Sequence, residues 1–162
     1  MMAIYQDAKE FFKHQPQWES SSRSQVMGFT NGCFDLLHAG HVDYLCQARK
    51  ECDFLIVGLN TDQSVRRLKG SSRPVQDQQS RAKVLEALRS VDGVIFFSED
   101  TPANLIETLQ PDRLFKGSDY QADDVIGKST VEHRGGRVIL LPFTQGQSTT
   151  TLVQRIQNQK GV

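Results

Sequence analysis

Apolar and polar residues follow one another along most of the chain in blocks typical of alternating strands and helices. Short apolar runs bounded by polar or glycine residues predict strands, and longer stretches with apolar residues three or four positions apart predict helices. Strands are predicted at 25–30, 53–60, 93–97, 112–117 and 137–143, and helices at 40–52, 61–68, 77–90, 101–109 and 149–159. This alternation predicts an α/β fold, with a parallel sheet that carries helices on both faces.

The first 24 residues stand outside this alternation. Their apolar residues follow helical spacing, and these are Ile4, Tyr5, Ala8, Phe11 and Phe12. The polar stretch "HQPQWESSSRSQ" that comes next is typical of a linker or loop. We therefore expect an N-terminal helical appendage and linker over residues 1–24, followed by one domain over residues 25–162.

The charge balance restricts the ligands that the protein is expected to bind. The chain has 19 basic and 19 acidic residues, so bulk positive charge for nucleic-acid binding is missing, and any anion site must be local. No apolar run approaches the roughly 18 residues of a membrane span, and the N-terminus lacks the apolar core of a signal peptide. We expect a cytoplasmic protein that binds neither nucleic acid nor membrane.

The segment "FTNGCFDLLHAGH", residues 29–41, leads from a predicted strand into a predicted helix. Ligands of parallel sheets bind beyond the carboxyl ends of the strands, near the point where the strand order reverses. A helix that begins near Gly40 places His38 and His41 beside free amide N–H groups, which bind anions, and Gly40 leaves room for a phosphate. The alternatives are two ordinary polar residues at a helix start and, less favoured by the spacing, a zinc pair.

The stretch "GCFDLLHAGH" resembles the signature of nucleotidyltransferases of the cytidylyltransferase type, which is HxGH after a G-x-F-D turn. Six further blocks are similar, in order, to those of the heptose 1-phosphate adenylyltransferases: "RLKGSSRPV", "DQQSRAKVLEAL", "VDGVIFFSEDTP", "KGSDY", "GGRVILLPF" and "GQSTTTLVQRI". The resemblance covers about residues 25–157 and implies a Rossmann-like fold. It also implies Mg²⁺-dependent transfer of AMP from ATP to D-glycero-β-D-manno-heptose 1-phosphate, giving ADP-heptose and pyrophosphate for lipopolysaccharide core synthesis.

The resemblance assigns roles to individual residues. His38 and His41 would hold the α-phosphate and the leaving oxygen, and Lys69 would approach as the third catalytic residue from the sugar-phosphate side. Asp35 and Arg73 join Lys69 on the substrate side, and Asp35 either orders its turn or reaches Mg²⁺; no other protein ligand for a metal is predicted. The nucleotide-binding positions are Asn31, Gly32, Cys33, Phe34, Gly40, Arg81, Lys116, Gly117, Asp119, Ser148, Thr149 and Thr150.

Structural interpretations of the same residues stay open. Lys69 can be a solvated surface lysine, and Arg73 and Arg81 can form ion pairs with nearby acidic residues. The hydroxyl groups of residues 148–150 can simply cap the last helix, although capping and phosphate binding are compatible.

The resemblance also concerns partners and rival functions. Related enzymes are often fused to a sugar kinase, so this chain is expected to act with a separate heptose kinase upstream, and a homodimer is the expected assembly. One rival function is cytidylyl or adenylyl transfer to another phosphate, such as glycerol 3-phosphate or FMN. The other is a catalytically silent nucleotide-binding module.

Overall fold

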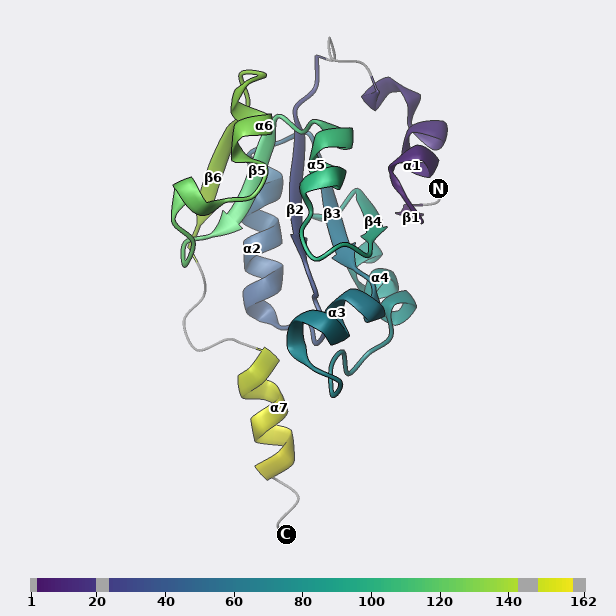
Figure 1. Cartoon of the computed structure of the whole chain (residues 1–162), viewed down its shortest axis with the longest axis vertical. Helices are drawn as coiled ribbons and strands as arrows, with labels where there is room; N and C mark the ends of the chain where they lie inside the picture. Colours follow the sequence, from purple (N-terminus) through teal and green to yellow (C-terminus); the bar gives the residue numbers. More distant parts are fainter. Residues whose placement is uncertain (1–2, 20–23, 143–148, 159–162) are drawn as a thin grey trace.

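The computed structural model describes residues 3–19, 24–142 and 149–158, and its centre is a six-stranded parallel sheet (Figure 1). The strands are β1 (Ile4–Tyr5), β2 (Met27–Gly32), β3 (Phe54–Asn60), β4 (Gly93–Phe97), β5 (Arg113–Gly117) and β6 (Arg137–Leu141). Their order is β1-β4-β3-β2-β5-β6. From β2 the chain moves outward through β3 and β4, then crosses to β5 and β6, so the order reverses between β2 and β5.

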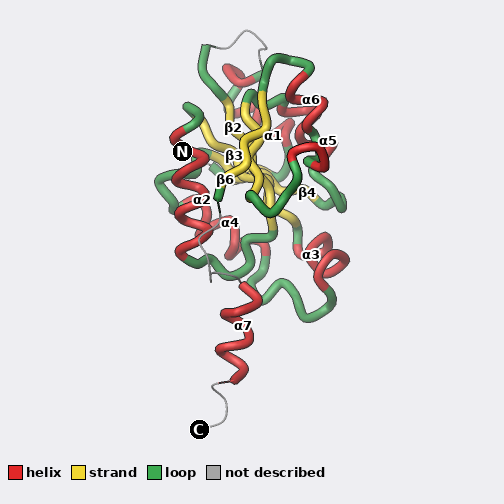
Figure 2. Tube along the Cα trace, turned by 90° about the vertical axis from the view of Figure 1, so that its left-hand side faces the viewer, coloured by secondary structure: helices red, strands yellow, loops and turns green. Residues whose placement is uncertain are grey.

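Helices cover both faces of this sheet, as Figure 2 shows. The helices are α1 (Ala8–His14), α2 (Ala39–Lys50), α3 (Asp62–Lys69), α4 (Gln78–Glu86), α5 (Ala103–Leu109), α6 (Lys128–Glu132) and α7 (Thr149–Asn158). Residues of α1, α5 and α6 form a core on one face, and residues of α2 and α4 form a core on the other. In β4, Ile95 and Phe97 enter the first core while Val94 and Phe96 enter the second, because side chains alternate along a strand.

The predicted parallel sheet with helices on both faces is therefore confirmed, and the strands and helices predicted beyond residue 25 all occur. The additional helix α6 has only five residues and begins after Gly127, whose φ of 89° is left-handed. A helix this short presents too few turns for an apolar period to be recognised in the sequence.

The N-terminal segment differs from the helical appendage that its spacing predicts. Ile4 and Tyr5 form a strand that pairs in parallel with Val94 and Ile95, and the helix begins only at Ala8. The apolar spacing did not reveal this strand, because its hydrogen-bond partners lie about 90 residues further along the chain. The segment from Ile4 to Trp18 covers the edge of the sheet. Its apolar residues from Tyr5 onward pack in the same core as Met27 and Phe29 of β2, whereas Ile4 packs against the other core.

Three aspartates clamp the amino ends of neighbouring strands. Asp53, Asp92 and Asp112 directly precede β3, β4 and β5. The backbone N–H of each donates to the carbonyl of a residue at the start of the next strand in the sheet, and its carboxylate accepts the N–H of that same residue at 2.8 Å. The pairs are Asp53 with Val26, Asp92 with Leu55 and Asp112 with Met27. This double contact fixes the register, which matters because a slip of one residue would exchange the two faces of a strand.

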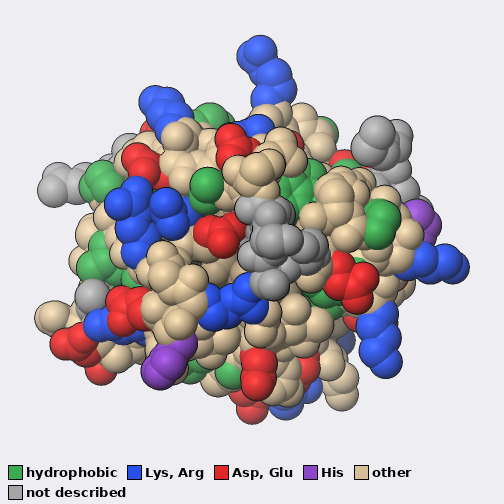
Figure 3. Space-filling view, turned by 90° about the horizontal axis from the view of Figure 1, so that it is seen from above, with side chains coloured by type: hydrophobic (Ala, Val, Ile, Leu, Met, Phe, Trp, Pro, Cys, Tyr) green, Lys and Arg blue, Asp and Glu red, His purple; other side chains and the backbone are tan. Residues whose placement is uncertain are grey.

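The surface at the amino ends of the strands carries no concentration of one charge. Figure 3, which views the molecule from above, shows Lys and Arg side chains interspersed with Asp and Glu side chains. Within the described residues no helix is both long enough and apolar enough to cross a membrane.

We expect the Asp112→Ala variant to lower the free energy of unfolding by about 1 to 3 kcal/mol, because it leaves the half-buried N–H of Met27 without its acceptor. Asp112→Asn should cost less, since the amide oxygen can still accept that bond. Urea unfolding would measure both, with Glu107→Ala on the exposed side of α5 as the control. A loss for Asp112→Ala no greater than that of the control would contradict the clamp.

Candidate functional site

A cavity of about 630 Å³ opens at the carboxyl ends of β2 and β5, where the strand order reverses. It brings together most of the residues that the sequence singles out. Those that line it are Asn31, Gly32, Cys33, Phe34, Asp35, His41, Lys69, Arg73, Lys116, Gly117, Asp119, Thr149 and Thr150. The imidazole of His41 and the cationic groups of Lys69, Arg73 and Lys116 therefore meet in one place, on a chain with no net charge.

The two histidines lie at the start of α2. His38 is the N-cap residue with an extended backbone (φ −138°, ψ 170°), and its carbonyl accepts the N–H of His41 at 2.9 Å. Their rings stack with centroids 3.8 Å apart, and the ring of Phe34 lies 5.2 Å from that of His41. His41 lines the cavity and His38 does not, so the ring of His38 contacts the cavity residue by stacking on it. Gly40 is buried in the first turn of α2, whose first N–H groups have no partner within the helix.

Both imidazoles are neutral at pH 7. Burial, together with the neighbouring His38, lowers the pKa of His41 to about 4, and burial lowers the pKa of His38 as well. The Nδ1 atom of each ring is buried and has no hydrogen-bond partner within the described residues. Unpaired buried polar atoms are rare in proteins, so this pair is suited to a polar ligand at the start of α2.

Lys116, near the end of β5, is a buried cation beside the cavity. Its Nζ donates to Oδ1 of Asn31 and lies 5.6 Å from the centre of the Tyr120 ring. Burial lowers the pKa of Lys116 to about 8, and the charge of Asp119 opposes this shift. The ammonium group is therefore charged at pH 7 yet largely removed from water, which strengthens its attraction to an anion.

Asp35 faces the loop after α3 and is fully engaged there. Its carboxylate accepts Nε of Arg73 at 2.5 Å and the backbone N–H groups of Val75 and Gln76 at 2.8 to 3.0 Å. Burial alone would raise the pKa of Asp35, but these donors outweigh it and lower the pKa. Three donors, one of them shared by both oxygens, hold the carboxylate, so Asp35 is less suited to bind a metal ion than a free carboxylate is.

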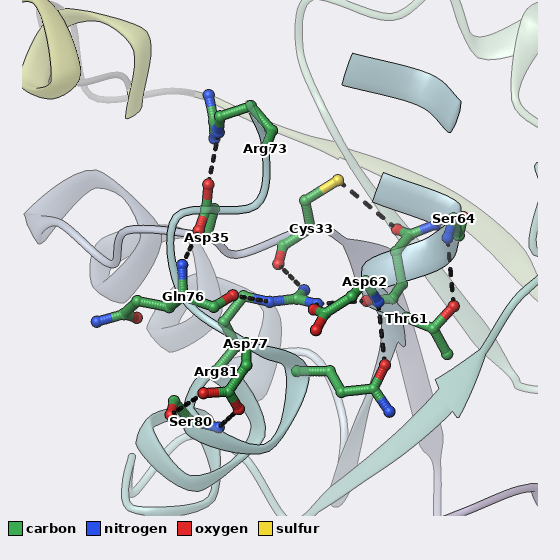
Figure 4. A network of polar contacts seen from close by, with 12 residues as sticks. Cys33, Asp35, Thr61, Asp62, Ser64, Arg73, Gln76, Asp77, Ser80 and Arg81 are labelled. Carbon is green, nitrogen blue, oxygen red and sulfur yellow. Dashed lines mark hydrogen bonds and ion pairs between the residues drawn. The ribbon is translucent and has the colours of Figure 1, made fainter. Parts of the chain in front are cut away.

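Arg81 does not reach the cavity, in contrast to its predicted place among the nucleotide-binding residues. Its side chain is 0% exposed, is not part of the cavity lining, and lies within a network of polar contacts (Figure 4). Nε donates to the carbonyl of Gln76 at 3.1 Å, Nη1 to that of Cys33 at 2.5 Å, and Nη2 to that of Asn60 at 2.9 Å and to Oδ1 of Asp62 at 2.7 Å. The ion-pair interpretation that the sequence left open is the one observed, because the position faces inward from α4.

Two of the three hydroxyl residues predicted to bind the triphosphate lie within the described part of the chain, at the start of α7. Thr149 and Thr150 begin α7 and line the cavity, and Oγ1 of Thr149 donates to the carbonyl of Leu36 at 3.5 Å. This contact brings the start of α7 to the turn that precedes α2. Ser148 lies outside the described residues.

Several cavity residues are absent from the sequence-based set. Tyr44 lies on α2, and its hydroxyl is 2.9 Å from Oγ1 of Thr30. Asn60 ends β3, and its amide donates to Oγ of Ser64 at 3.0 Å. A polar residue directly after a buried apolar strand was the available signal for Asn60, because that position lies at the carboxyl edge. Tyr44 gives no comparable signal, since an aromatic residue on a helix is typical of a core.

Comparison with curated proteins finds close relatives that are much longer than this chain. The chain is 57% identical over 129 residues to the bifunctional protein HldE of Nitrobacter hamburgensis, which covers 80% of this chain and 26% of that protein. It is 52% identical over 151 residues to the protein of the same name from Mesorhizobium japonicum, which covers 93% of this chain and 30% of that protein. The chain thus spans less than a third of the length of these relatives.

Solved structures with the same architecture include two of different function. The lipopolysaccharide core biosynthesis protein from Thermoplasma volcanium is 27% identical with a TM-score of 0.61, covering 76% of this chain and 100% of that one. Pantoate-beta-alanine ligase from Francisella tularensis, complexed with beta-gamma ATP and beta-alanine, is 24% identical with a TM-score of 0.65, covering 91% of this chain and 69% of that one. The second likeness concerns the fold alone.

A family model covers most of the cavity-forming part of the chain. It is described as cytidylyltransferase-like and matches residues 29–155. This range begins within β2, contains the histidine pair at the start of α2, and extends into α7. The chain therefore belongs to the cytidylyltransferase-like family.

Proposed function

We propose that this protein is an adenylyltransferase that transfers AMP from ATP to D-glycero-β-D-manno-heptose 1-phosphate. The products would be pyrophosphate and ADP-heptose, a precursor of the lipopolysaccharide core. The observation that carries the proposal is the convergence of His41, Lys69, Arg73 and Lys116 on one cavity at the switch point of the sheet. The identity of 52–57% to HldE proteins and the ordered blocks similar to heptose 1-phosphate adenylyltransferases support the choice of acceptor.

The reaction needs charge stabilisation more than it needs a base. An oxygen of the sugar 1-phosphate forms a bond to the α-phosphorus of ATP, and the bond from that phosphorus to the β-bridging oxygen breaks, so pyrophosphate leaves with the electron pair. A phosphate monoester is largely dianionic at pH 7, since its second pKa is about 6, and so no proton has to be removed. The protein must hold both reactants in line and stabilise the charge that develops on the phosphate oxygens.

The positions of the donors around the cavity support one role for each of them in this scheme. His41, supported by His38 and the free N–H groups at the start of α2, would receive the α-phosphate and the leaving oxygen. Lys69 and Arg73 would hold the sugar phosphate. Lys116 and the neighbouring residues would bind the nucleotide, and these are Asn31, Gly32, Cys33, Phe34, Gly117 and Asp119. The start of α7, with Thr149 and Thr150, would bind the β- and γ-phosphates; Ser148 remains a sequence-based candidate for the same role.

Mg²⁺ would enter this site together with ATP. Within residues 3–19, 24–142 and 149–158, no three His, Cys, Asp or Glu side chains are grouped so that they could hold a metal ion. The triphosphate oxygens and water would therefore supply most of its ligands, which is usual for Mg²⁺ in nucleotide sites. When bound, the ion would neutralise part of the phosphate charge.

The proposal also includes the upstream enzyme, the compartment and the assembly of the protein. A sugar 1-phosphate is the product of phosphorylation at the anomeric carbon, so a heptose kinase would act upstream. We place the reaction in the cytoplasm, where ATP is available, and propose a homodimer as the assembly. The catalytic unit would begin near residue 25, with the segment before it completing the sheet edge.

Pyrophosphate release measured across nucleotides and acceptors tests the function directly. With heptose 1-phosphate as the acceptor, we expect kcat/KM for ATP to exceed that for CTP by about 10² or more. A pocket built for the adenine edge leaves buried groups unpaired with cytosine, at about 1 to 3 kcal/mol each. Equal rates with both nucleotides, or a preference for CTP with glycerol 3-phosphate, would contradict the proposal. Binding of ATP without turnover of any acceptor would indicate the silent module.

The His41→Ala variant should keep its fold and bind ATP within about threefold of the wild type, while kcat falls by roughly 10² to 10³. This is the loss expected when one donor to the transition state is removed. His133→Ala, at an exposed histidine that follows α6, serves as the control. A fall of less than tenfold would show that His41 does not stabilise the leaving oxygen.

The affinity for ATP should weaken above pH 8 because Lys116 loses its proton there. Binding of an anion favours the charged lysine, so the free protein must take up a proton to bind once the pH exceeds 8. We expect the dissociation constant of ATP to rise by about tenfold per pH unit beyond that point. In Lys116→Gln the constant should be higher and nearly independent of pH from 7.5 to 9.5, whereas Lys128→Gln, at an exposed ion pair, should follow the wild type.

A further inference from the structure

The loop that joins α3 to α4 follows directly on the cavity residue Lys69 and carries the cavity residue Arg73. α3 ends at Lys69, and Gly70 caps it with a left-handed φ of 94° that lets the chain turn sharply. The N–H of Arg73 then donates to the carbonyl of Gly70 at 3.1 Å. The orientation of Lys69 and Arg73 toward the cavity depends on how this loop, residues 70–76, is held.

Asp35 is the group that holds the loop. It lies in the turn between β2 and α2, its side chain is 0% exposed, and it accepts three different donors from the loop. Phe34, just before it, has a left-handed φ of 42°, a costly conformation for a residue other than glycine. The same strained turn sets the Phe34 ring against His41 and directs the neighbouring carboxylate to the loop.

Only one nitrogen of the Arg73 guanidinium donates to Asp35. The contact runs through Nε, and the terminal Nη atoms have no hydrogen bond to any described residue, although Arg73 lines the cavity. Figure 4 shows Asp35 and Arg73 meeting at this contact, on the other side of the cluster from Arg81. A guanidinium anchored at Nε presents its two terminal nitrogens as a fork, which is the geometry that recognises a phosphate.

We propose that Asp35 is a positioning residue for the acceptor substrate: it orients Arg73 so that the fork receives the phosphate of the sugar 1-phosphate, and it does not bind Mg²⁺. This inference rests on the proposed function. It distinguishes between the two roles that the sequence left open for Asp35, because a buried carboxylate with both oxygens bonded to donors of the loop is held in place to orient Arg73. Binding of ATP, on the opposite side of the transferred phosphate, does not involve this contact.

Steady-state kinetics with Asp35→Asn and Arg73→Gln separate the two roles. Both variants should raise KM for heptose 1-phosphate by at least about tenfold and leave the dissociation constant of ATP within about twofold. The Mg²⁺ concentration for half-maximal activity should be unchanged. The combined variant should have nearly the same KM as either single variant, since each substitution already removes the contact between Asp35 and Arg73. Arg137→Gln, which breaks the Arg137–Glu51 pair between two residues that do not line the cavity, is the matched control and should leave KM unaltered.

Hydrogen exchange at residues 70–76 provides a readout that needs no turnover. Asp35→Ala, which removes both acceptor oxygens, should accelerate exchange of the Val75 and Gln76 amides by about tenfold or more, while Arg73→Gln should leave them protected, because their acceptor is then intact. A shift in the Mg²⁺ requirement of Asp35→Asn, with an unchanged KM for the acceptor, would overturn the proposal in favour of a metal ligand. So would multiplicative effects in the combined variant, or unaltered amide exchange. If wild-type protein transfers AMP to no sugar phosphate, the proposed function fails, and amide exchange still decides whether Asp35 holds the loop.

Discussion

The buried guanidinium of Arg81 is the interaction on which the shape of the site depends. It joins the turn after β2, the end of β3, the start of α3 and the loop before α4, through three carbonyls and one carboxylate. Removing such a charge from water costs several kcal/mol unless its donors are satisfied, and here the four contacts come from four different segments. The turn after β2 and the loop before α4, which both carry residues of the cavity lining, are therefore joined to one buried cation that is not part of that lining.

The charge states of the side chains in the cavity are suited to binding a highly charged anionic ligand. The histidine pair is neutral, and Lys116 holds its charge against burial with the help of Asn31 and Asp119. The free protein thus avoids the repulsion that several fixed positive charges would cause in a small space. In the proposed reaction the polyphosphate of ATP would supply the negative charge, and donors that are already held in place would stabilise the transition state most effectively.

The sequence predicted the local features of this site and missed those that depend on distant contacts. The segment from Asn31 to His41 could be interpreted because the strand, the turn and the helix start follow one another directly in the sequence. The sheet itself could be predicted because each of its longer strands is a short apolar run that is recognised without its partners. The burial of Arg81 could not be foreseen, because its partner Cys33 lies 48 residues earlier. The engagement of Asp35 by Val75, 40 residues later, was equally hidden. Ile4 and Tyr5 were assigned to a helix for the same reason, since only their distant partners in β4 make them a strand.

The aspartate clamps and the cavity lie at opposite edges of the sheet, and this separation bears on how the protein can evolve. Asp53, Asp92 and Asp112 determine the strand register at the amino edge, while the loop of residues 70–76 is attached at the carboxyl edge through Asp35 and Arg81. Substitutions in this loop that keep those two attachments can accumulate without disturbing the contacts that align the strands. Under the proposed function, a lineage with this sheet would therefore be free to explore new acceptors while it continues to fold.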